Sequence, residues 1–206
     1  MVRIPEHPLL EPAILDCTLS GPLGGLASSD NILRGLSVDF EGPLATDDEV
    51  KGSVRKLLRH AGFKPSGRNK PASEYLIKAA EKGFLGSINL LVDVCNVVSL
   101  HSGLPISVVD LDRTEGELAI GIGDGEYIFN AAGQELRLDG LLCLRDAQGW
   151  CANSVKDSQR TKTTDDTLRA LYVVWGTNAL PGRAAQAADW ATSLLQLAGV
   201  HVERRL

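Results

Sequence analysis

Apolar residues recur at the spacing of an α-helix in four stretches of the chain, which therefore predict four helices. Their expected ranges are 46–61, 71–82, 88–101 and 182–198. The first is expected to begin with a capping box, in which Thr46 and Glu49 each bond to a backbone N–H at the helix start. Pro71 suits the first turn of the second helix, and Gly103 is expected to end the third.

The helix expected over residues 88–101 has apolar residues on nearly all of its sides, so it should be the most buried of the four. Asn89, Asp93 and Asn96 interrupt this pattern and share one stripe, because they are spaced i, i+4 and i+7. A buried amide or carboxylate left without a partner costs about 1–3 kcal/mol. Two interpretations follow. The three side chains either tie the helix to neighbouring backbone or line the wall of a pocket.

Short β-rich segments dominate the chain between residues 106 and 175. Strands are expected over 106–109, 117–122, 127–130, 136–138, 141–145, 149–152 and 168–175, with two more near the N-terminus at 13–19 and 32–40. Asp124-Gly125 is a strong signal for a two-residue hairpin turn, so segments 117–122 and 127–130 are expected to pair. Segment 168–175 alternates poorly and is expected to be buried on both faces.

The order of these elements indicates the α+β class, because helices precede a run of strands instead of alternating with them. We expect the helices to pack on a mainly antiparallel or mixed sheet. A single domain is expected over residues 1–206. In it, residues 1–45 form an N-terminal extension with short strands, 46–176 form the core, and 181–199 form an amphipathic C-terminal helix.

Composition narrows the class of protein. Of the 206 residues 44% are apolar, enough for a sizeable core, and the net charge of −5 argues against a generally basic nucleic-acid binder. No charged-then-apolar leader and no run of about 18 apolar residues occurs, so neither secretion nor membrane insertion is predicted. The four cysteines and four histidines are dispersed without metal-ligand spacing. This pattern predicts reduced thiols, no metal site and a cytoplasmic location.

Positive charge is concentrated in one stretch of this acidic chain. Residues 51–70, the basic stretch, contain seven Lys and Arg and no Asp or Glu. Arg55, Arg59 and Arg68 belong to it. A charge run of this kind is either a solvated helix face or a patch that docks a local piece of polyphosphate.

A second polar stretch, residues 153–164, lies between two expected strands. It contains groups that bind phosphate and ribose, namely Lys156, Arg160, Lys162 and hydroxyls that include Thr163. Asp157 in its middle is the best-placed candidate for a base or a water-orienting group. A plain surface loop would have a similar composition, so both interpretations stand.

Three segments taken together resemble the B3/4 domain, which is the editing domain in the beta subunit of phenylalanyl-tRNA synthetase and also occurs as free-standing proteins. They read INLLVDVCNVVSLHSGLPISVVDLD, GELAI…GDGEYIFN and KDSQRTKTTDDTLRALYVV, and the resemblance covers residues 54–176. The closest matches are Ile88-Asn89, Val92-Asp93 with Asn96, Gly103 with Pro105, and Asp110. The pair Asp157-Ser158 with Arg160-Thr161-Lys162 is similar to the free-standing branch.

The resemblance implies an α+β domain whose pocket hydrolyses the ester between a wrong amino acid and tRNA, and it implies no cofactor. This chain departs from the family pattern at two places. Ser107 stands where the synthetase domain has a histidine, two residues after the proline of its Gly-Gln-Pro motif. Free-standing relatives have a Trp-Asn-Trp-Arg-Asp run where this chain reads Ala-Asn-Ser-Val-Lys-Asp over residues 152–157, without the aromatic residues.

The resemblance also implies roles for individual residues. Asp157 would orient the attacking water, and Lys156 would stabilise developing charge. The side chains implied to shape the substrate pocket are Asn89, Asp93, Asn96 and Ser107. Those implied to hold the terminal nucleotides are Arg160, Lys162 and Thr163, and those implied to meet the acceptor stem are Arg55, Arg59 and Arg68. The implied partner is the aminoacylated 3′ end of tRNA, with no membrane and no metal.

Two other functions fit the same residues. A domain that kept the fold and lost the chemistry, as Ser107 allows, would be a non-catalytic tRNA-binding or accessory module. A protein with a similar pocket and no tRNA contact would bind or hydrolyse a small amino acid derivative. Phosphate contacts make affinity fall steeply with salt, so salt dependence separates the two tRNA-binding functions from this last one. A turnover assay separates the deacylase from the non-catalytic module.

Overall fold

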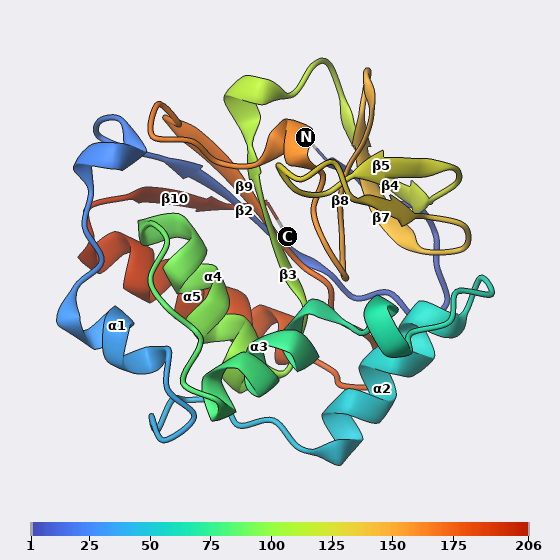
Figure 1. The fold of residues 1–206 in the computed structure, drawn as a ribbon, viewed down its shortest axis with the longest axis horizontal. Coiled ribbons are helices and arrows are strands. Elements are labelled where there is room, and N and C mark those ends of the chain that lie inside the picture. Colours follow the sequence, from blue (N-terminus) through green and yellow to red (C-terminus); the bar gives the residue numbers. More distant parts are fainter. Residues whose placement is uncertain (1, 206) are drawn as a thin grey trace.

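The computed structural model describes residues 2–205, which form two four-stranded sheets, a two-stranded ribbon and five α-helices (Figure 1). The first sheet has the order β1 (Val2–Arg3), β4 (Leu118–Ile122), β7 (Leu142–Asp146) and β8 (Gly149–Asn153). The second has the order β10 (His201–Arg204), β2 (Ala13–Thr18), β9 (Arg169–Val174) and β3 (Ile106–Asp110). The ribbon pairs β5 (Glu126–Ile128) with β6 (Glu135–Arg137). Only β1 and β4 pair in parallel among these strands.

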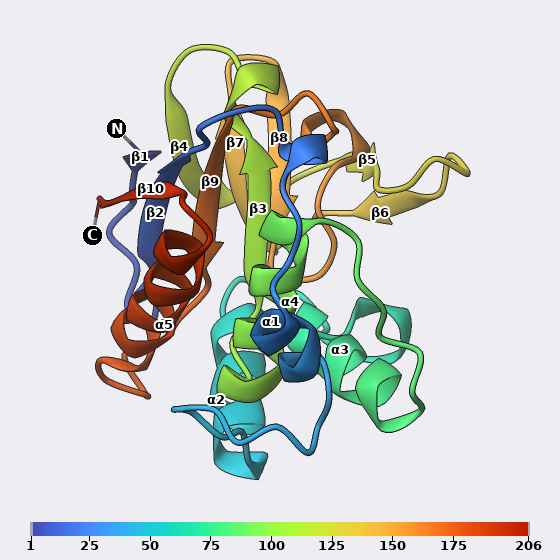
Figure 2. The same ribbon diagram turned by 90° about the vertical axis from the view of Figure 1, so that its left-hand side faces the viewer.

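Residues 2–205 form five α-helices, of which the last two pack on the second sheet. The five helices are α1 (Asp30–Gly35), α2 (Asp48–Arg59), α3 (Ala72–Glu81), α4 (Leu90–Ser102) and α5 (Arg183–Leu197). Helices α4 and α5 pack against each other and against strands of the second sheet, while α1 and α3 pack on α4 (Figure 2). The expected α+β class and the C-terminal amphipathic helix are confirmed. The division of the chain into an extension and a core stays a prediction.

Helix α4 is buried because apolar residues surround it, as its sequence predicts. Twelve of its 13 residues are buried, and Val92 is the exception. Its start and end follow from local signals. The Asn89 side chain accepts the Val92 N–H as the N-cap, and Gly103 takes the left-handed conformation (φ 72°) that ends the helix. Gly103 also packs against Thr46, where a Cβ would collide.

Strand β9 is the centre of the second sheet, because β2 and β3 pair with its two edges. Its residues from Ala170 to Val174 are all buried, which confirms a strand covered on both faces. The two sheets and the helices share one hydrophobic core. The four cysteines are buried and unpaired, as expected. Among residues 2–205 no helix is long and apolar enough to cross a membrane.

Three local predictions were wrong. Residues 32–40 are not a strand, because Ile32 and Leu36 are buried at the i, i+4 spacing of α1 and the turn that follows it. Helix α2 is capped by Asp47, whose carboxylate accepts the Val50 N–H, and not by Thr46. An aspartate in the N-cap position thus replaces the expected capping box.

The third wrong prediction is the hairpin at Asp124-Gly125. Strand β4 pairs with β7, and β5 pairs with β6, so β4 and β5 do not pair with each other. The backbone on either side of Asp124 instead bonds to the segment between β6 and β7. The Gly123 N–H donates to the Leu141 carbonyl, and the Leu138 N–H donates to the Gly125 carbonyl. These bonds fix the two segments that connect the first sheet with the ribbon.

Candidate functional site

A cavity of about 590 Å³ lies where α3, the first half of α4, strand β3 and the ribbon meet. Figure 2 shows the ribbon extending away from the body of the molecule, above α3. The apolar lining residues include Leu76, Val92, Cys95, Ile106 and Val108. The polar lining residues are Asn89, Asn96, Asn130, Lys156, Asp157, Lys162 and Thr163. An apolar chamber with a few converging polar groups is the usual form of a small-molecule site.

Two of the three stripe residues line this cavity, namely Asn89 at the N-cap of α4 and Asn96 within the helix. The Asn89 side chain caps the helix and donates from Nδ2 to Thr163 Oγ1 at 3.3 Å, which ties the 153–164 stretch to α4. Asn96 is only 9% exposed, and its carboxamide has no hydrogen-bond partner among residues 2–205. A buried amide without a protein partner is free to bond a ligand or water in the cavity.

Asp93 does not line the cavity, which corrects the expectation that all three residues would. Its carboxylate accepts hydrogen bonds from Ser28 Oγ at 2.6 Å, Ser87 Oγ at 2.5 Å and the Ile88 N–H at 2.7 Å. The side chain is fully buried. These bonds hold the segments around Ser28 and Ser87 against the start of α4. Asp93 therefore links the helix to neighbouring segments and does not form part of a pocket wall.

The backbone that carries Lys156 and Asp157 is fixed by the side chain at the end of β8. Asn153 Oδ1 accepts the N–H groups of Val155 and Lys156, and Asn153 Nδ2 donates to Tyr127 Oη at 2.5 Å. Tyr127 Oη in turn donates to the Lys156 carbonyl at 2.6 Å. The loop is therefore held to the ribbon by a closed set of hydrogen bonds, and it is not a freely solvated loop.

Asp157 is half-buried and faces the cavity. Its Oδ1 accepts hydrogen bonds from Ser107 Oγ at 2.7 Å and from the Asn153 N–H at 3.2 Å. Burial raises the pKa of this carboxyl to about 6, because an apolar surrounding disfavours the charged form. The bond from Ser107, the bonds from the Asn153 and Val108 backbone and the charge of Lys162 oppose that rise. A carboxyl with a pKa of about 6 is suited to proton transfer near neutral pH.

The two lysines of the site have different surroundings. Lys156 Nζ lies 4.0 Å from the centroid of the Phe129 ring and 5.8 Å from that of Tyr75. Lys162 Nζ donates to the Phe129 carbonyl at 2.6 Å. Burial lowers the pKa of both, and the nearby Asp157 charge partly restores that of Lys162. The cation that acts on Asp157 is thus Lys162 and not Lys156, its neighbour in the sequence.

Arg160 lies outside the cavity, although it was expected to hold nucleotides. Its guanidinium makes a bidentate ion pair with Asp146, with N···O distances of 2.9 and 2.8 Å. The Asp146 side chain is fully buried and also accepts the N–H groups of Glu115, Gln148 and Gly149. Arg160 therefore stabilises the loop through Asp146 and does not bind a ligand in the cavity. Ser107 is likewise fully buried, and it reaches the cavity only through its bond to Asp157.

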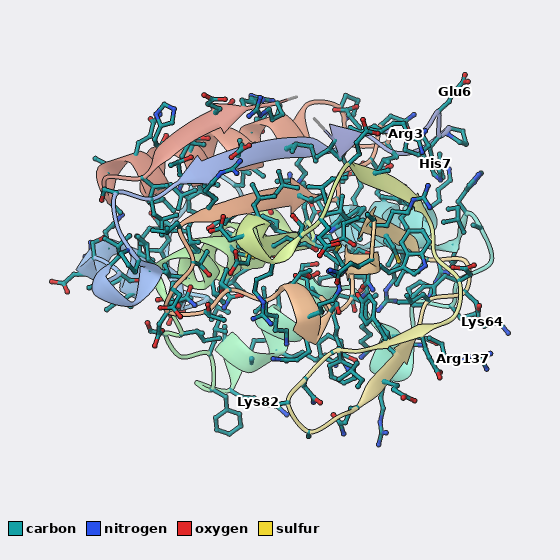
Figure 3. All side chains as sticks on the ribbon, turned by 90° about the horizontal axis from the view of Figure 1, so that it is seen from above. Arg3, Glu6, His7, Lys64, Lys82 and Arg137 are labelled. Carbon is teal, nitrogen blue, oxygen red and sulfur yellow. The ribbon has the colours of Figure 1, made fainter. Side chains whose placement is uncertain are left out.

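Some charges of the basic stretch are paired within the protein, and others are exposed at the surface. Arg55 makes a bidentate ion pair with the buried Glu74, with both N···O distances at 2.6 Å. Arg59 and Arg68 are exposed, and the charge of Arg68 lowers the pKa of Lys156 at the cavity. Figure 3 shows Lys64 of this stretch and Arg137 of β6 projecting outward on the same side of the molecule. The exposed charge of Arg68 therefore connects the basic stretch to the cavity, whereas Arg137 of the ribbon pairs with Asp139 at 3.4 Å.

Several residues of the site carried no signal in the sequence. Tyr75 and Phe129 belong to segments that read as an ordinary helix and strand, yet they line the cavity. Tyr127 and Trp175 act through hydrogen bonds to residues distant in the chain. Within residues 2–205 no group of three or more His, Cys, Asp or Glu side chains is placed to hold a metal ion.

The fold and the cavity define an α+β domain with a carboxylate in an apolar chamber, and comparison with known proteins places it in a family. The chain belongs to the B3/4 domain family, whose model matches residues 63–189. It is 31% identical over 134 residues to the phenylalanine–tRNA ligase beta subunits of Bordetella pertussis, Bordetella parapertussis and Bordetella bronchiseptica. Those matches cover 61% of this chain and 16% of each relative.

The fold is also similar to that of a solved structure, an N-terminal fragment of the phenylalanyl-tRNA synthetase beta subunit from Pyrococcus horikoshii. The TM-score is 0.53 at 11% sequence identity, and the match covers 98% of this chain and 50% of the fragment. The similarity confirms the fold expected from the resemblance.

Proposed function

We propose that the chain is an aminoacyl-tRNA deacylase that acts in trans on mischarged tRNA. The observation that carries this proposal is Asp157, an acidic side chain at the wall of an apolar cavity, with its pKa raised by burial to about 6. The relation to phenylalanine–tRNA ligase beta subunits supports tRNA as the partner. An aminoacyl ester is already activated, so a positioned water and stabilisation of the oxyanion suffice for its hydrolysis.

In the proposed reaction Asp157 accepts a proton from a water molecule as the water oxygen attacks the ester carbonyl carbon. The resulting tetrahedral oxyanion is stabilised by the Lys156 ammonium group, which lines the same cavity. The intermediate collapses as the bond to the ribose oxygen breaks, and the proton passes from Asp157 to that oxygen. The products are a free amino acid and a tRNA with a free terminal hydroxyl.

The remaining polar groups take positions around this reaction. The apolar wall and the Asn96 carboxamide hold the amino acid, Asn89 shapes the wall, and Lys162 and Thr163 meet the terminal nucleotide. Arg59 and Arg68 contact phosphates of the acceptor stem. Arg55, Arg160 and Asp93 act in the structure, because their charges are bound to partners within the protein.

This proposal is tested by measuring binding and hydrolysis in parallel on the same mischarged tRNA. Hydrolysis together with salt-sensitive binding supports the deacylase. Salt-sensitive binding with no hydrolysis above the spontaneous rate would instead indicate a non-catalytic tRNA-binding module. Hydrolysis of a free amino acid ester with no tRNA binding would indicate a protein that acts on small amino acid derivatives.

A first prediction concerns the basic stretch. Replacing both Arg59 and Arg68 by Glu should weaken tRNA binding and reduce the slope of log K against log salt by about 1.5 to 2, because two phosphate contacts are lost. Binding is measured over a range of salt concentrations. Lys82→Glu is the matched control, since Lys82 is also exposed but lies outside the basic stretch. An unchanged slope in the double variant would show that Arg59 and Arg68 make no phosphate contacts and that the basic stretch is a solvated helix face.

A second prediction concerns pH. The base must be ionised, and the pKa of Asp157 is raised to about 6, so the deacylation rate should fall about tenfold per pH unit below that value. The rate should be level between pH 7 and 8 after correction for spontaneous hydrolysis. The measurement is a single-turnover rate at saturating protein. A rate that stays level down to pH 5 would exclude Asp157 as the base.

A further inference from the structure

Three side chains form a hydrogen-bonded chain from the protein core to the cavity. Trp175 Nε1 donates to Ser107 Oγ at 2.9 Å, and Ser107 Oγ donates to Asp157 Oδ1 at 2.7 Å. Trp175 and Ser107 are fully buried; Trp175 directly follows β9, and Ser107 lies on β3. Because β3 and β9 are paired strands of one sheet, the two groups are fixed relative to each other.

The direction of these bonds follows from the donors available. An indole N–H can only donate, so Ser107 Oγ must accept from Trp175. The single proton of the hydroxyl group then has two possible acceptors, Asp157 Oδ1 at 2.7 Å and the Asn153 carbonyl at 3.1 Å. An ionised carboxylate is the stronger acceptor and the nearer one. The Asn153 N–H also bonds to Oδ1, so both of these bonds hold the same oxygen of Asp157.

We propose that Ser107 and Trp175 are positioning residues that hold the Asp157 carboxylate by Oδ1 and so fix its orientation at the wall of the cavity, where the ligand binds. Trp175 fixes the hydroxyl rotor of Ser107, and Ser107 in turn fixes the carboxylate. The hydrogen-bonded chain stands on its own geometry, whereas its consequence for catalysis rests on the proposed function.

Among the groups of residues 2–205 around Asp157, only Asp157 itself changes its charge near pH 6. Its ionisation is therefore the change that affects the hydrogen bonds from Ser107 and Trp175. Cys95 of α4, Tyr127 of β5 and Cys143 of β7 interact with the carboxylate, and burial raises the pKa of each, so they are uncharged there. Lys162 provides a positive charge. Protonation of Asp157 weakens the bond from Ser107, and that change alters the bond from Trp175.

The direct test observes the indole N–H resonances of the three tryptophans by ¹H–¹⁵N NMR between pH 5 and 8. The Trp175 resonance should shift with a midpoint near 6, and this shift should disappear in Asp157→Asn and in Ser107→Ala. Trp150 donates to the exposed Asp124, and Trp190 lies beside His101, so their resonances report on other groups and confirm that the variants are folded. A Trp175 resonance that does not titrate, or that still titrates in Asp157→Asn, would overturn the proposal.

The second test measures how the deacylation rate depends on pH. Ser107→Ala removes a bond to the charged form of Asp157, so the acid limb should move up by about 1 to 2 pH units. The control is Ser99→Ala, which removes another fully buried hydroxyl, one that donates to the Leu104 carbonyl, and should leave the limb in place. An acid limb unmoved in Ser107→Ala would overturn the positioning role. If the wild-type protein hydrolyses no aminoacyl-tRNA, the proposed function fails. The NMR titration alone then decides whether Trp175, Ser107 and Asp157 are linked by hydrogen bonds.

Discussion

Replacing Asp157 by Asn should lower the turnover of a mischarged tRNA by about 10²–10⁴-fold, which is the usual effect of losing a positioned base. An amide cannot accept the proton of water, but it keeps the shape of the side chain and an oxygen that Ser107 can bond. The affinity for tRNA should change little, because the phosphate contacts lie elsewhere. The measurement compares single-turnover rates and dissociation constants of the two proteins on the same tRNA.

The same replacement should make the protein more stable, which excludes misfolding as the cause of the lost activity. The pKa of Asp157 is about 6 in the folded protein and near 3.9 in an unfolded chain. Its ionised form is therefore disfavoured by folding, and stability is lost as the pH rises through about 6. At pH 7 the asparagine variant should gain about 1–3 kcal/mol in the free energy of unfolding, measured in urea. A variant with full activity would contradict the assignment of Asp157.

Replacing Arg160 by Ala should destabilise the protein by about 3 kcal/mol, although the residue lies in a stretch rich in phosphate-binding groups. The change removes the bidentate partner of Asp146 and leaves a fully buried carboxylate without a cation. Breaking a buried pair from one side costs several kcal/mol, because the remaining charge is not compensated. The measurement is the free energy of unfolding in urea at neutral pH.

Two comparisons sharpen the Arg160 prediction. Arg113→Ala removes an exposed guanidinium whose one bond within residues 2–205 is to the Lys162 carbonyl at 3.3 Å, so it should change stability by less than about 0.5 kcal/mol. Arg160→Lys keeps the positive charge and loses the bidentate geometry. Its loss of stability should therefore be smaller than that of Arg160→Ala and larger than that of Arg113→Ala. If Arg160→Ala were as stable as the wild type and bound tRNA more weakly, Arg160 would be a nucleotide contact after all.

The parts of the site that the sequence predicted are those with local signals. Helix α4 could be recognised from its apolar periodicity and its terminal Gly103, and this placed Asn89 and Asn96 on one face. The polar loop brought Lys156 and Asp157 to the same cavity, because strand β8 ends just before them and the ring of bonds around Asn153 holds the turn. Such features depend on neighbours a few residues away.

The parts that the sequence could not predict depend on partners far along the chain. Asp93 reads as a pocket residue until Ser28, 65 residues earlier, is seen to donate to it. Ser107 and Trp175 are 68 residues apart, and strand pairing alone brings them together. Residues 32–40 were misread for a related reason, since burial of Ile32 and Leu36 against the core decides between a short helix and a strand.

The most direct test of the central claim is a deacylation assay of the wild-type protein over a panel of mischarged tRNAs at neutral pH. Each tRNA carries a labelled amino acid, and its release is compared with spontaneous hydrolysis in the same buffer. We predict that at least one mischarged tRNA loses its amino acid well above the spontaneous rate, and that Asp157→Asn abolishes most of this excess. Rates equal to spontaneous hydrolysis for the whole panel would contradict the proposed function.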